Sequence, residues 1–535
     1  MKINANNSYD YIIVGGGSAG CAIANRLSSV KTNKVLLIEA GKKSNILSKF
    51  PISFALFIDK PSVNWRYRSE PEKNTNFREI PVPRGKILGG SSSINGMVYV
   101  RGQQLDFDTW AQMGNKGWSF DDILPFYKKM ENYKGKKSKL RGKGGLININ
   151  EVNDKNPLYD AIFSAGEKCN LSRNPDYNGV YQEGLSFSQT TINSGQRVSS
   201  EFAYLRPIYK RNNLKVITKS HVTKLLFWSK KCIGVEVKSN NIIKKYYSNH
   251  EVILSAGAIN SPQILELSGI GQRSVLKKNS IDLIHELDGV GENLRDHIIP
   301  RLIYEIKKSN VTFNDKARGL GLIKEAFKYL LCRGGFFSLP SAPIIGFYKT
   351  KKELSNPDVQ LHFVPYRIIF ENGKRILSKK AGITCAINQN RPESKGSVHI
   401  NSNDPFNAPQ IKFNFLSSSI DIESLIGGIR KIRELMSSNP MNEFTGVEIQ
   451  PGKDIETDED ILGFIRDKAE TAYHPVGTCK MGNDKLAVVD NELKVHGIKN
   501  LRIADASIMP TLISGNTNAV CMMIGEKCAD LILNK

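Results

Sequence analysis

The feature that most constrains this chain is a glycine-rich turn near its start, Gly15-x-Gly17-x-x-Gly20. A short apolar run at residues 11–14 precedes the turn, and apolar residues at helical spacing follow it. A second apolar run occupies residues 34–38. Strand, tight turn, helix and strand in this order predict a right-handed βαβ unit with two parallel strands.

Each position of this motif has a physical reason in a dinucleotide site. Gly15 permits the tight turn, Gly17 lets the backbone approach a pyrophosphate, and Gly20 lets helix and strand pack closely. Free N–H groups at the helix N-terminus favour phosphate oxygens, and the acid after the second strand is placed to accept hydrogen bonds from a ribose. The predicted site comprises Gly15, Gly17, Ser18, Ala19, Gly20, Glu39 and Ala40, and by itself it does not distinguish FAD from NAD.

The rest of the chain predicts two domains built from interleaved segments. Its 535 residues allow more than one core, and short buried strands recur near residues 252–254 and 501–503. Residues 359–363 and 396–400 alternate with period two, which is typical of an antiparallel sheet with one wetter face. We therefore predict an α/β fold with a Rossmann-like nucleotide-binding domain assembled from discontinuous segments, plus an α+β substrate domain with an antiparallel sheet. The approximate boundaries are 1–155, 212–300 and 466–535 for the first domain, and 156–211 and 301–465 for the second.

Charge and composition exclude several classes of protein. The formal net charge is +23, but basic residues are spread along the chain, and the one dense cluster, at residues 134–143, is glycine-rich and predicted to be a solvated loop. Few aromatic residues interleave with it, so we expect no nucleic-acid partner. No apolar run approaches the roughly 20 residues of a membrane span. A polar start and eight scattered cysteines predict a cytoplasmic protein with reduced thiols, with peripheral contact at the inner membrane left open.

Several longer motifs resemble one enzyme family. Residues 83–97 (PRGKILGGSSSINGM) and 257–271 (GAINSPQILELSGIG) resemble the two signatures of the glucose–methanol–choline (GMC) oxidoreductases. Family-like blocks also lie at 290–297 (VGENLRDH), 474–479 (HPVGTC), 505–507 (DAS) and 515–519 (GNTNA). They stand in the family's order from near the start to near the end of the chain, and residues 95–102 are similar to the choline dehydrogenase and alcohol dehydrogenase branch.

This resemblance implies bound FAD and oxidation of an alcohol. In the family, the segment around residues 89–92 passes the flavin ring, and residues 95–98 lie near its reactive edge. Some members attach FAD covalently through a histidine just before the asparagine, but Ile94 occupies that position here, so we predict non-covalent FAD. The cofactor-binding residues that the resemblance adds are Trp65, Gly89, Gly90, Ser91, Asn95, Gly96, Met97, Val98, Val222, Ala256, Asp505, Ala506, Asn516 and Thr517.

The resemblance makes His474 the predicted catalytic base. Alcohol oxidation removes the hydroxyl proton and transfers a hydride from the carbinol carbon to flavin N5, and an imidazole suits the first step. Asn518 is predicted to donate a hydrogen bond to the alkoxide, or to cap the C-terminal helix, or both. His297 is interpreted as structural, and the other histidines show no metal-ligand spacing, so no metal site is predicted.

The predicted substrate is an uncharged aliphatic or aromatic primary alcohol, which yields an aldehyde. Choline-oxidising members place a glutamate where this chain has Ile299, although another carboxylate from the substrate domain is not excluded, so choline dehydrogenase remains the alternative. We expect a dehydrogenase rather than an oxidase; the electron acceptor is left open among oxygen, a quinone and an artificial carrier. A NAD(P)-dependent dehydrogenase, a flavoprotein of the same fold that does not oxidise alcohols, and a photodecarboxylase are rival interpretations. Oligomeric state is not predicted.

Overall fold

The predicted βαβ unit forms the start of a seven-stranded sheet in the computed structural model, which describes residues 7–371 and 374–534. Strand β1 pairs in parallel with β2 on one side and with β14 on the other, and helix α1 (Ser18–Leu27) connects the first two. The strand order is β11-β2-β1-β14-β13-β12, with β28 also pairing in parallel with β14. Their bounds are Leu214–Ile217, Val35–Ile38, Ser8–Val14, Ile242–Leu254, Lys231–Ser239, His221–Trp228 and Leu501–Ile503.

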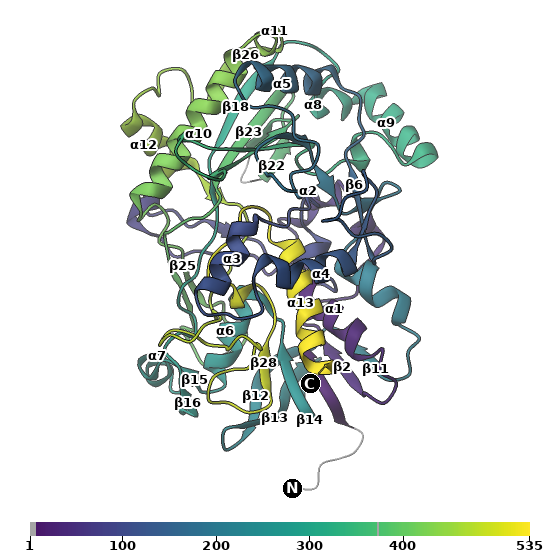
Figure 1. Cartoon of the computed structure of the whole chain (residues 1–535), viewed down its shortest axis with the longest axis vertical. Helices are drawn as coiled ribbons and strands as arrows, with labels where there is room; N and C mark the ends of the chain where they lie inside the picture. Colours follow the sequence, from purple (N-terminus) through teal and green to yellow (C-terminus); the bar gives the residue numbers. More distant parts are fainter. Residues whose placement is uncertain (1–6, 372–373, 535) are drawn as a thin grey trace.

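The second sheet has six strands, all antiparallel, in the order β26-β18-β23-β20-β19-β7. Helix α10 (Ser419–Ser437) packs on β23 and β20, and helix α5 (Pro157–Lys168) packs on α10. The two sheets occupy opposite ends of the molecule, with both termini near the first sheet (Figure 1). The strand bounds are Thr445–Gln450, Arg301–Ile306, Gly382–Gln389, Val359–Val364, Ile344–Tyr348 and Gly184–Phe187.

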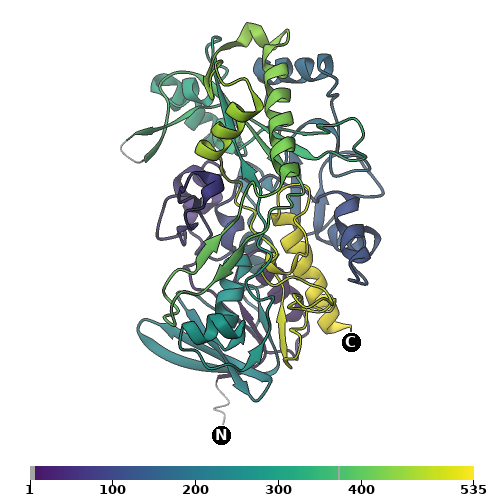
Figure 2. The ribbon, with the colours of Figure 1, turned by 90° about the vertical axis from the view of Figure 1, so that its left-hand side faces the viewer.

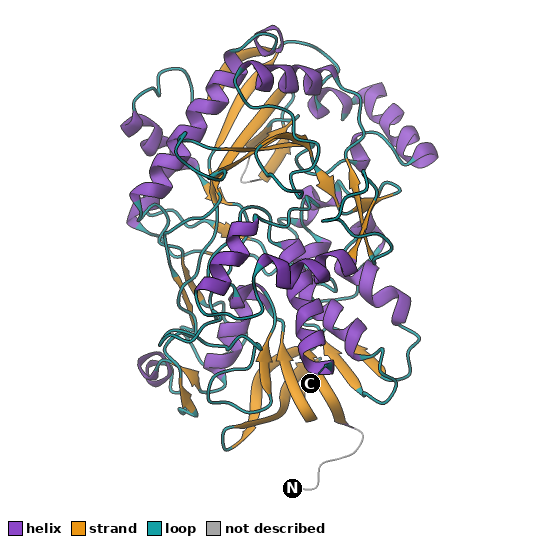
Figure 3. Ribbon diagram, viewed as in Figure 1, coloured by secondary structure: helices purple, strands orange, loops and turns teal. Residues whose placement is uncertain are grey.

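The side view and the secondary-structure view confirm the predicted fold class. Figure 2 shows the two tiers stacked along the long axis, and Figure 3 shows helices covering the sheets at both ends. Strands of the first sheet come from the segments 1–155, 212–300 and 466–535, and those of the second come from 156–211 and 301–465. The exact domain boundaries stay a prediction. Helix α13 (Asn518–Leu533) packs against α1, which brings the end of the chain back to the first turn.

The expectation of one wetter face is wrong for β20. Its residues are buried on both faces, including Gln360 and His362. One face lies under α10, and the other contributes His362 and Val364 to the wall of a large cavity. The polar half of the period-two pattern therefore faces the cavity and not the solvent.

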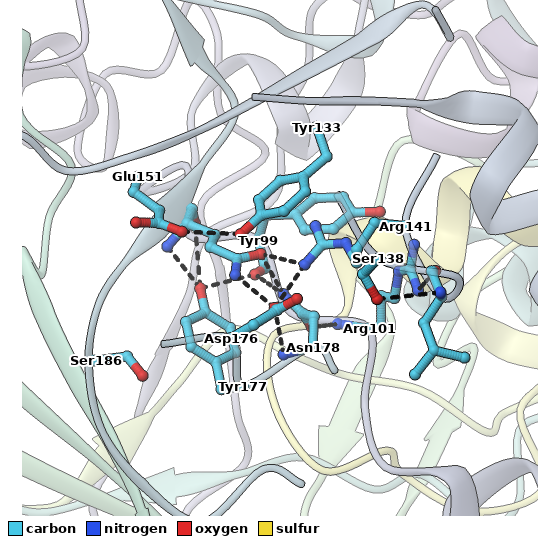
Figure 4. Close-up of polar contacts among 12 residues, drawn as sticks. Tyr99, Arg101, Tyr133, Ser138, Arg141, Glu151, Asp176, Tyr177, Asn178 and Ser186 are labelled. Atoms are coloured by element: carbon cyan, nitrogen blue, oxygen red, sulfur yellow. Dashed lines mark hydrogen bonds and ion pairs between the residues drawn. The ribbon is translucent and has the colours of Figure 1, made fainter. Parts of the chain in front are cut away.

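The basic loop at residues 134–143 also differs from the expectation at one position. Its lysines are exposed, but Arg141 is buried and pairs with Glu131 and Asp176. Figure 4 shows Arg141 beside Asp176 in this group of polar contacts. Arg101 and Tyr99 bind the same Glu131 carboxylate as Arg141. Although burial opposes ionisation, the two arginines hold the pKa of Glu131 below its usual range. The buried Glu131 carboxylate requires a paired cation, and Arg141 supplies one from the loop. This ion pair anchors the loop at Arg141.

The remaining elements connect the two tiers. No helix in residues 7–371 and 374–534 is long and apolar enough to cross a membrane. All eight cysteines are free thiols. The prediction of a cytoplasmic location rests partly on residues 1–6, which lie outside the described residues, and it stays a prediction.

The other elements that concern the site are α2 (Ser53–Phe57), α6 (Gly257–Leu267), α8 (Phe313–Lys316), α9 (Gly319–Cys332), β17 (Ile298–Ile299), β21 (Ile368–Glu371), β22 (Lys374–Leu377), β27 (Glu470–Thr471) and the 3₁₀ turns Gly90–Ser93 and Phe336–Ser338.

Candidate active site

A cavity of about 910 Å³ runs from the glycine-rich turn to the second sheet. It is lined by His474, Asn518 and every predicted cofactor-binding residue except Gly20 and Gly89. Those two lie behind the wall and shape it: the main-chain N–H of Gly89 donates to the carbonyl of Gly16 at 2.7 Å, and Gly20 packs directly on the carbonyl of Gly15. The sequence-based set therefore converges on one space, although it comes from segments hundreds of residues apart.

The nucleotide end of the cavity is built mainly from backbone. Gly15 has φ of +101°, and a side chain there would collide with the carbonyl of Ser255. Gly17 is different, because a Cβ placed on it would meet only the Ser255 carbonyl oxygen, at 3.9 Å. Its open side faces the cavity beside the N-terminus of α1, so a phosphate can approach the main chain there.

Glu39 closes this end of the cavity. Its carboxylate accepts hydrogen bonds from the main-chain N–H groups of Gly16, at 2.9 Å, and Gly41, at 2.7 Å. Burial raises the pKa of Glu39 to about 7, against the effect of those two hydrogen bonds. A carboxylate fixed in this way, directly after β2, has free lone pairs for a ribose diol.

The middle of the cavity wall is held by a residue that the sequence analysis missed. Arg197 is buried, and its Nη1 donates to the carbonyl of Asn95 at 2.7 Å and to Asn95 Oδ1 at 2.8 Å. Burial lowers the pKa of this guanidinium to about 9. Arg197 thereby fixes the segment that the resemblance assigns to the flavin edge, and no sequence motif had pointed to it.

Two histidines meet at the other end. His474 follows β27, and its Nδ1 lies 3.0 Å from Nδ1 of His297, which precedes β17. The His297 Nε2 lies 2.9 Å from the carbonyl oxygen of Asn390. The two strands pair antiparallel, with Ile298 opposite Thr471, and this pairing brings the rings together.

These contacts assign the tautomers of both rings. The Asn390 carbonyl only accepts, so His297 carries its proton on Nε2, and its neutral Nδ1 is an acceptor. His474 must then donate from Nδ1, which leaves the lone pair on its Nε2. Burial, with the nearby groups His297, Arg84 and His362, lowers the pKa of His474 well below its ordinary value, and burial lowers that of His297 to about 4. His474 is therefore a neutral imidazole with a proton-accepting nitrogen aimed away from His297.

The amide in contact with that nitrogen belongs to Asn516. Its Nδ2 lies 3.1 Å from His474 Nε2, and its Oδ1 accepts from Gln360 Nε2 at 3.2 Å, which fixes the amide orientation. Asn518 also lines the cavity, but its Oδ1 accepts from the hydroxyl of Ser18 at 2.8 Å. The alternative role of Asn518 as a helix cap is wrong, because α13 begins at Asn518 and Thr517 holds the cap position.

Asp296 fixes the backbone around the pair. Its carboxylate accepts from the main-chain N–H of His474 at 2.8 Å and of His297 at 2.7 Å, and from the hydroxyl of Thr471. Burial raises the pKa of Asp296 to about 7. The interpretation of His297 as structural stays a prediction, and its contact with His474 adds a positioning role, because it determines the tautomer of His474.

The charged groups in the cavity wall near β27 include two arginines and one glutamate that form one cluster. Arg301 Nη1 donates to Glu470 at 2.8 Å, and Arg375 donates to the same carboxylate at 3.2 Å. Burial opposes ionisation of Glu470, yet these arginines lower its pKa. Ile299, two residues before Arg301, also lies in the cavity wall. It occupies the position at which the resemblance implies a glutamate in choline-oxidising members. The Glu470 carboxylate is thus already neutralised, and the cluster of Arg301, Arg375 and Glu470 carries a net positive charge.

The remaining walls at this end are apolar and aromatic. They comprise Ile303, Phe313, Phe336, Phe337, Val364, Tyr366 and Tyr473, with Ala55 and Leu322 at exposed positions of α2 and α9. Among the described residues, no group of three or more His, Cys, Asp or Glu side chains is arranged to hold a metal ion.

A Rossmann-like sheet whose cavity ends at a buried neutral imidazole is typical of an enzyme that binds a dinucleotide and moves a proton. The chain belongs to the GMC oxidoreductase family: the N-terminal family model matches residues 9–299 and the C-terminal model matches residues 392–525. The family binds FAD, so the protein is an FAD-dependent oxidoreductase, and the NAD(P) alternative is excluded.

Full-length relatives include enzymes with two different names. The chain is 41% identical to "alcohol dehydrogenase [acceptor]" of Pseudomonas putida, over 98% of this chain and 96% of that protein. It is 38% identical to the oxygen-dependent choline dehydrogenase of Photobacterium profundum, over 99% and 93% of the two chains.

Solved structures agree with the fold. Pyridoxine 4-oxidase from Mesorbium loti is similar with a TM-score of 0.89 and 27% identity, covering 98% of this chain and 99% of the other. A variant of Aspergillus oryzae formate oxidase, studied for FAD modification, is similar with a TM-score of 0.90 and 28% identity, over 98% of each chain.

Proposed function

We propose that this protein oxidises an uncharged primary alcohol to an aldehyde, with FAD as hydride acceptor and His474 as base. The observation that carries the proposal is the fixed tautomer of His474, whose Nε2 lone pair faces the cavity. The identities of 38–41% to alcohol and choline dehydrogenases support the reaction class.

The residues of the cavity fit FAD. The open side of Gly17, the N-terminus of α1 and the Glu39 carboxylate would hold the phosphates and ribose, and the segment 90–98 would hold the ring. FAD, when bound, supplies an isoalloxazine ring whose N5 accepts the hydride of the carbinol carbon. Ile94 offers no nucleophile at the position of covalent attachment, so we propose that FAD is non-covalent.

The chain's own residues would handle the proton. The substrate hydroxyl would donate to His474 Nε2 in place of the Asn516 amide, and that amide would then donate to the alkoxide oxygen as negative charge develops. Because Asn516 already contacts His474, we propose that it takes the role predicted for Asn518. Asn518 would help to hold the α1 turn through Ser18.

The charges at the substrate end support an uncharged substrate. A trimethylammonium group is attracted by an unpaired anion, whereas the Glu470 carboxylate is shared by Arg301 and Arg375, and the net positive charge of this cluster repels a cation. We therefore propose that an aliphatic or aromatic alcohol is preferred over choline. We further propose that the protein is a dehydrogenase rather than an oxidase. Both full-length relatives are named dehydrogenases, whereas the similar structures include oxidases.

Anaerobic bleaching of the flavin tests the proposal. The holoprotein is mixed with 1-octanol, benzyl alcohol or choline without oxygen, and loss of the flavin absorption band is followed. We expect bleaching by the first two and slow or no bleaching by choline. Bleaching by choline alone would overturn the substrate assignment.

The variant His474→Ala tests the base. We expect it to bind FAD and to lose about 10³-fold or more in the rate of flavin reduction, given typical contributions of general bases. The matched control is His250→Ala, since His250 is exposed at the first sheet. Equal rates in the His474 variant and the wild type would contradict the proposed role.

A further inference from the structure

Helix α9 (Gly319–Cys332) presents its apolar face to solvent. Leu320 is 84% exposed, Phe327 60% and Leu331 79%, and Ile323 and Leu330 lie on the same face. A surface helix ordinarily turns its apolar stripe toward the core. Figure 1 shows α9 at the edge of the tier that contains the second sheet, projecting away from the strands.

This orientation is fixed by polar contacts on the opposite face of the helix. The buried Glu325 accepts from the main-chain N–H of Phe336 at 2.9 Å, and the hydroxyl of Tyr329 donates to the carbonyl of Gly195 at 2.8 Å. The ring of Tyr329 also lies 5.5 Å from that of Phe50. The outward apolar stripe is therefore a consequence of how α9 is anchored.

Basic residues surround this stripe. The exposed cations are Arg318, Lys324, Lys328 and Arg333. The acids nearest α9 are less exposed than these cations: Glu325 is buried, and Asp154 and Asp315 are partly buried. An apolar stripe with a basic margin is complementary to a lipid surface that carries anionic headgroups.

The active-site cavity reaches the protein surface near α9. Leu322 of α9 is 40% exposed and also lines the cavity, together with Ala317 before the helix and Ala55 of α2. Leu56, next to Ala55, is 63% exposed. Residues 300–391, which contain α9, lie between the two family-model matches.

We propose that α9 docks this protein on an anionic lipid bilayer, with its apolar stripe at the boundary between headgroups and acyl chains and the cavity mouth next to the lipid. With 14 residues the helix is shorter than the roughly 20 needed to span the hydrocarbon, so it lies along the surface. The docking proposal does not depend on the proposed reaction. If that reaction also holds, apolar alcohols reach the mouth directly from the bilayer.

Vesicle flotation with purified holoprotein tests docking. The wild type is mixed with vesicles of phosphatidylcholine alone or with 30% phosphatidylglycerol, and the floated fraction is measured. We expect binding to the anionic vesicles, weakened by high salt, and little binding to the neutral ones.

Two pairs of variants separate the apolar and the basic contributions. Phe327→Glu with Leu331→Glu should lower binding at least tenfold, while Trp228→Glu, at a 78% exposed position of β12, should leave it unchanged. Lys324→Gln with Lys328→Gln should lower it roughly tenfold. Lys136→Gln with Lys137→Gln, in the basic loop at 134–143, should have no effect. Retained flavin absorbance and thermal midpoint verify folding of each variant.

Three results would overturn the proposal. One is no binding to anionic vesicles by the wild type. Another is binding that survives the α9 substitutions but is lost in the variant of the basic loop. The third is a wild-type dimer in solution that the Phe327 and Leu331 substitutions convert to monomers without affecting vesicle binding, because the apolar stripe would then be an interface between two copies of this chain.

Discussion

The two ends of the cavity are built by different means. The nucleotide end depends on backbone: glycines at a turn, a helix N-terminus and the main-chain N–H groups that hold Glu39. The catalytic end depends on side chains, and the His297–His474 contact joins residues 177 positions apart. Backbone sites leave a local sequence signature, whereas side-chain sites are assembled by strand pairing, as between β17 and β27.

After the loss of the base itself, the largest expected effect is at the catalytic end and compares two amides. We expect Asn516→Ala to lower kcat/KM about 10²-fold, because it removes the donor beside His474 Nε2. Asn518→Ala should lower it less than tenfold, since its amide contacts Ser18. Steady-state kinetics on the best alcohol decide between them, and the reverse order would restore the role predicted from the sequence.

At the nucleotide end, Gly17→Ala should separate cofactor binding from folding. A Cβ at Gly17 meets only one atom, at 3.9 Å, so the apoprotein should keep its thermal midpoint. The same Cβ occupies the open side of the turn, and we expect the FAD Kd to rise about tenfold. Titration of the apoprotein with FAD measures this. Gly20→Ala is the matched contrast, because it collides with the carbonyl of Gly15 and should lower the thermal midpoint itself.

The pH profile sharpens the account of the histidine pair. The base must be neutral to accept a proton, so activity falls as pH drops through its pKa. Because the pKa of His474 is lowered, the acid limb of kcat/KM should lie below pH 6.5. His297→Ala should lower kcat severalfold, because His297 orients His474. It should also shift the acid limb to higher pH, because His297 lowers the pKa of His474. An unchanged limb would limit His297 to a structural role.

The smallest effect concerns a histidine outside the cavity. His399 lies between Glu266, at 2.7 Å, and Glu292, at 3.1 Å, and despite burial they raise its pKa to about 9. A raised pKa stabilises the folded state fully below pH 6.5, and this stabilisation is lost as pH rises toward 9. We expect on the order of 2 kcal/mol, seen as a fall of a few degrees in thermal midpoint. The variant His399→Gln should show a smaller fall over the same range.

Much of the fold could be predicted from the sequence because its signals are local. The βαβ unit, the buried end of β14, strand β28 and the C-terminal helix each follow from a short apolar pattern, whereas β11, β12 and β13 were not predicted. The alternation in β20 was recognised, but its polar face was assigned to solvent. Periodicity reports which residues share a face, and it does not report what covers that face, which here is the cavity.

By itself the sequence determined the dinucleotide turn, the family and the identity of the candidate base, because each of them leaves a motif of consecutive residues. Only the tertiary structure decided which nitrogen of His474 carries the lone pair, which asparagine lies against it, that Arg301 and Arg375 share Glu470, and that α9 turns its apolar face outward. Each of these depends on side chains from distant segments meeting in a buried space, where the position of one proton or one charge is set by the neighbours that the fold supplies.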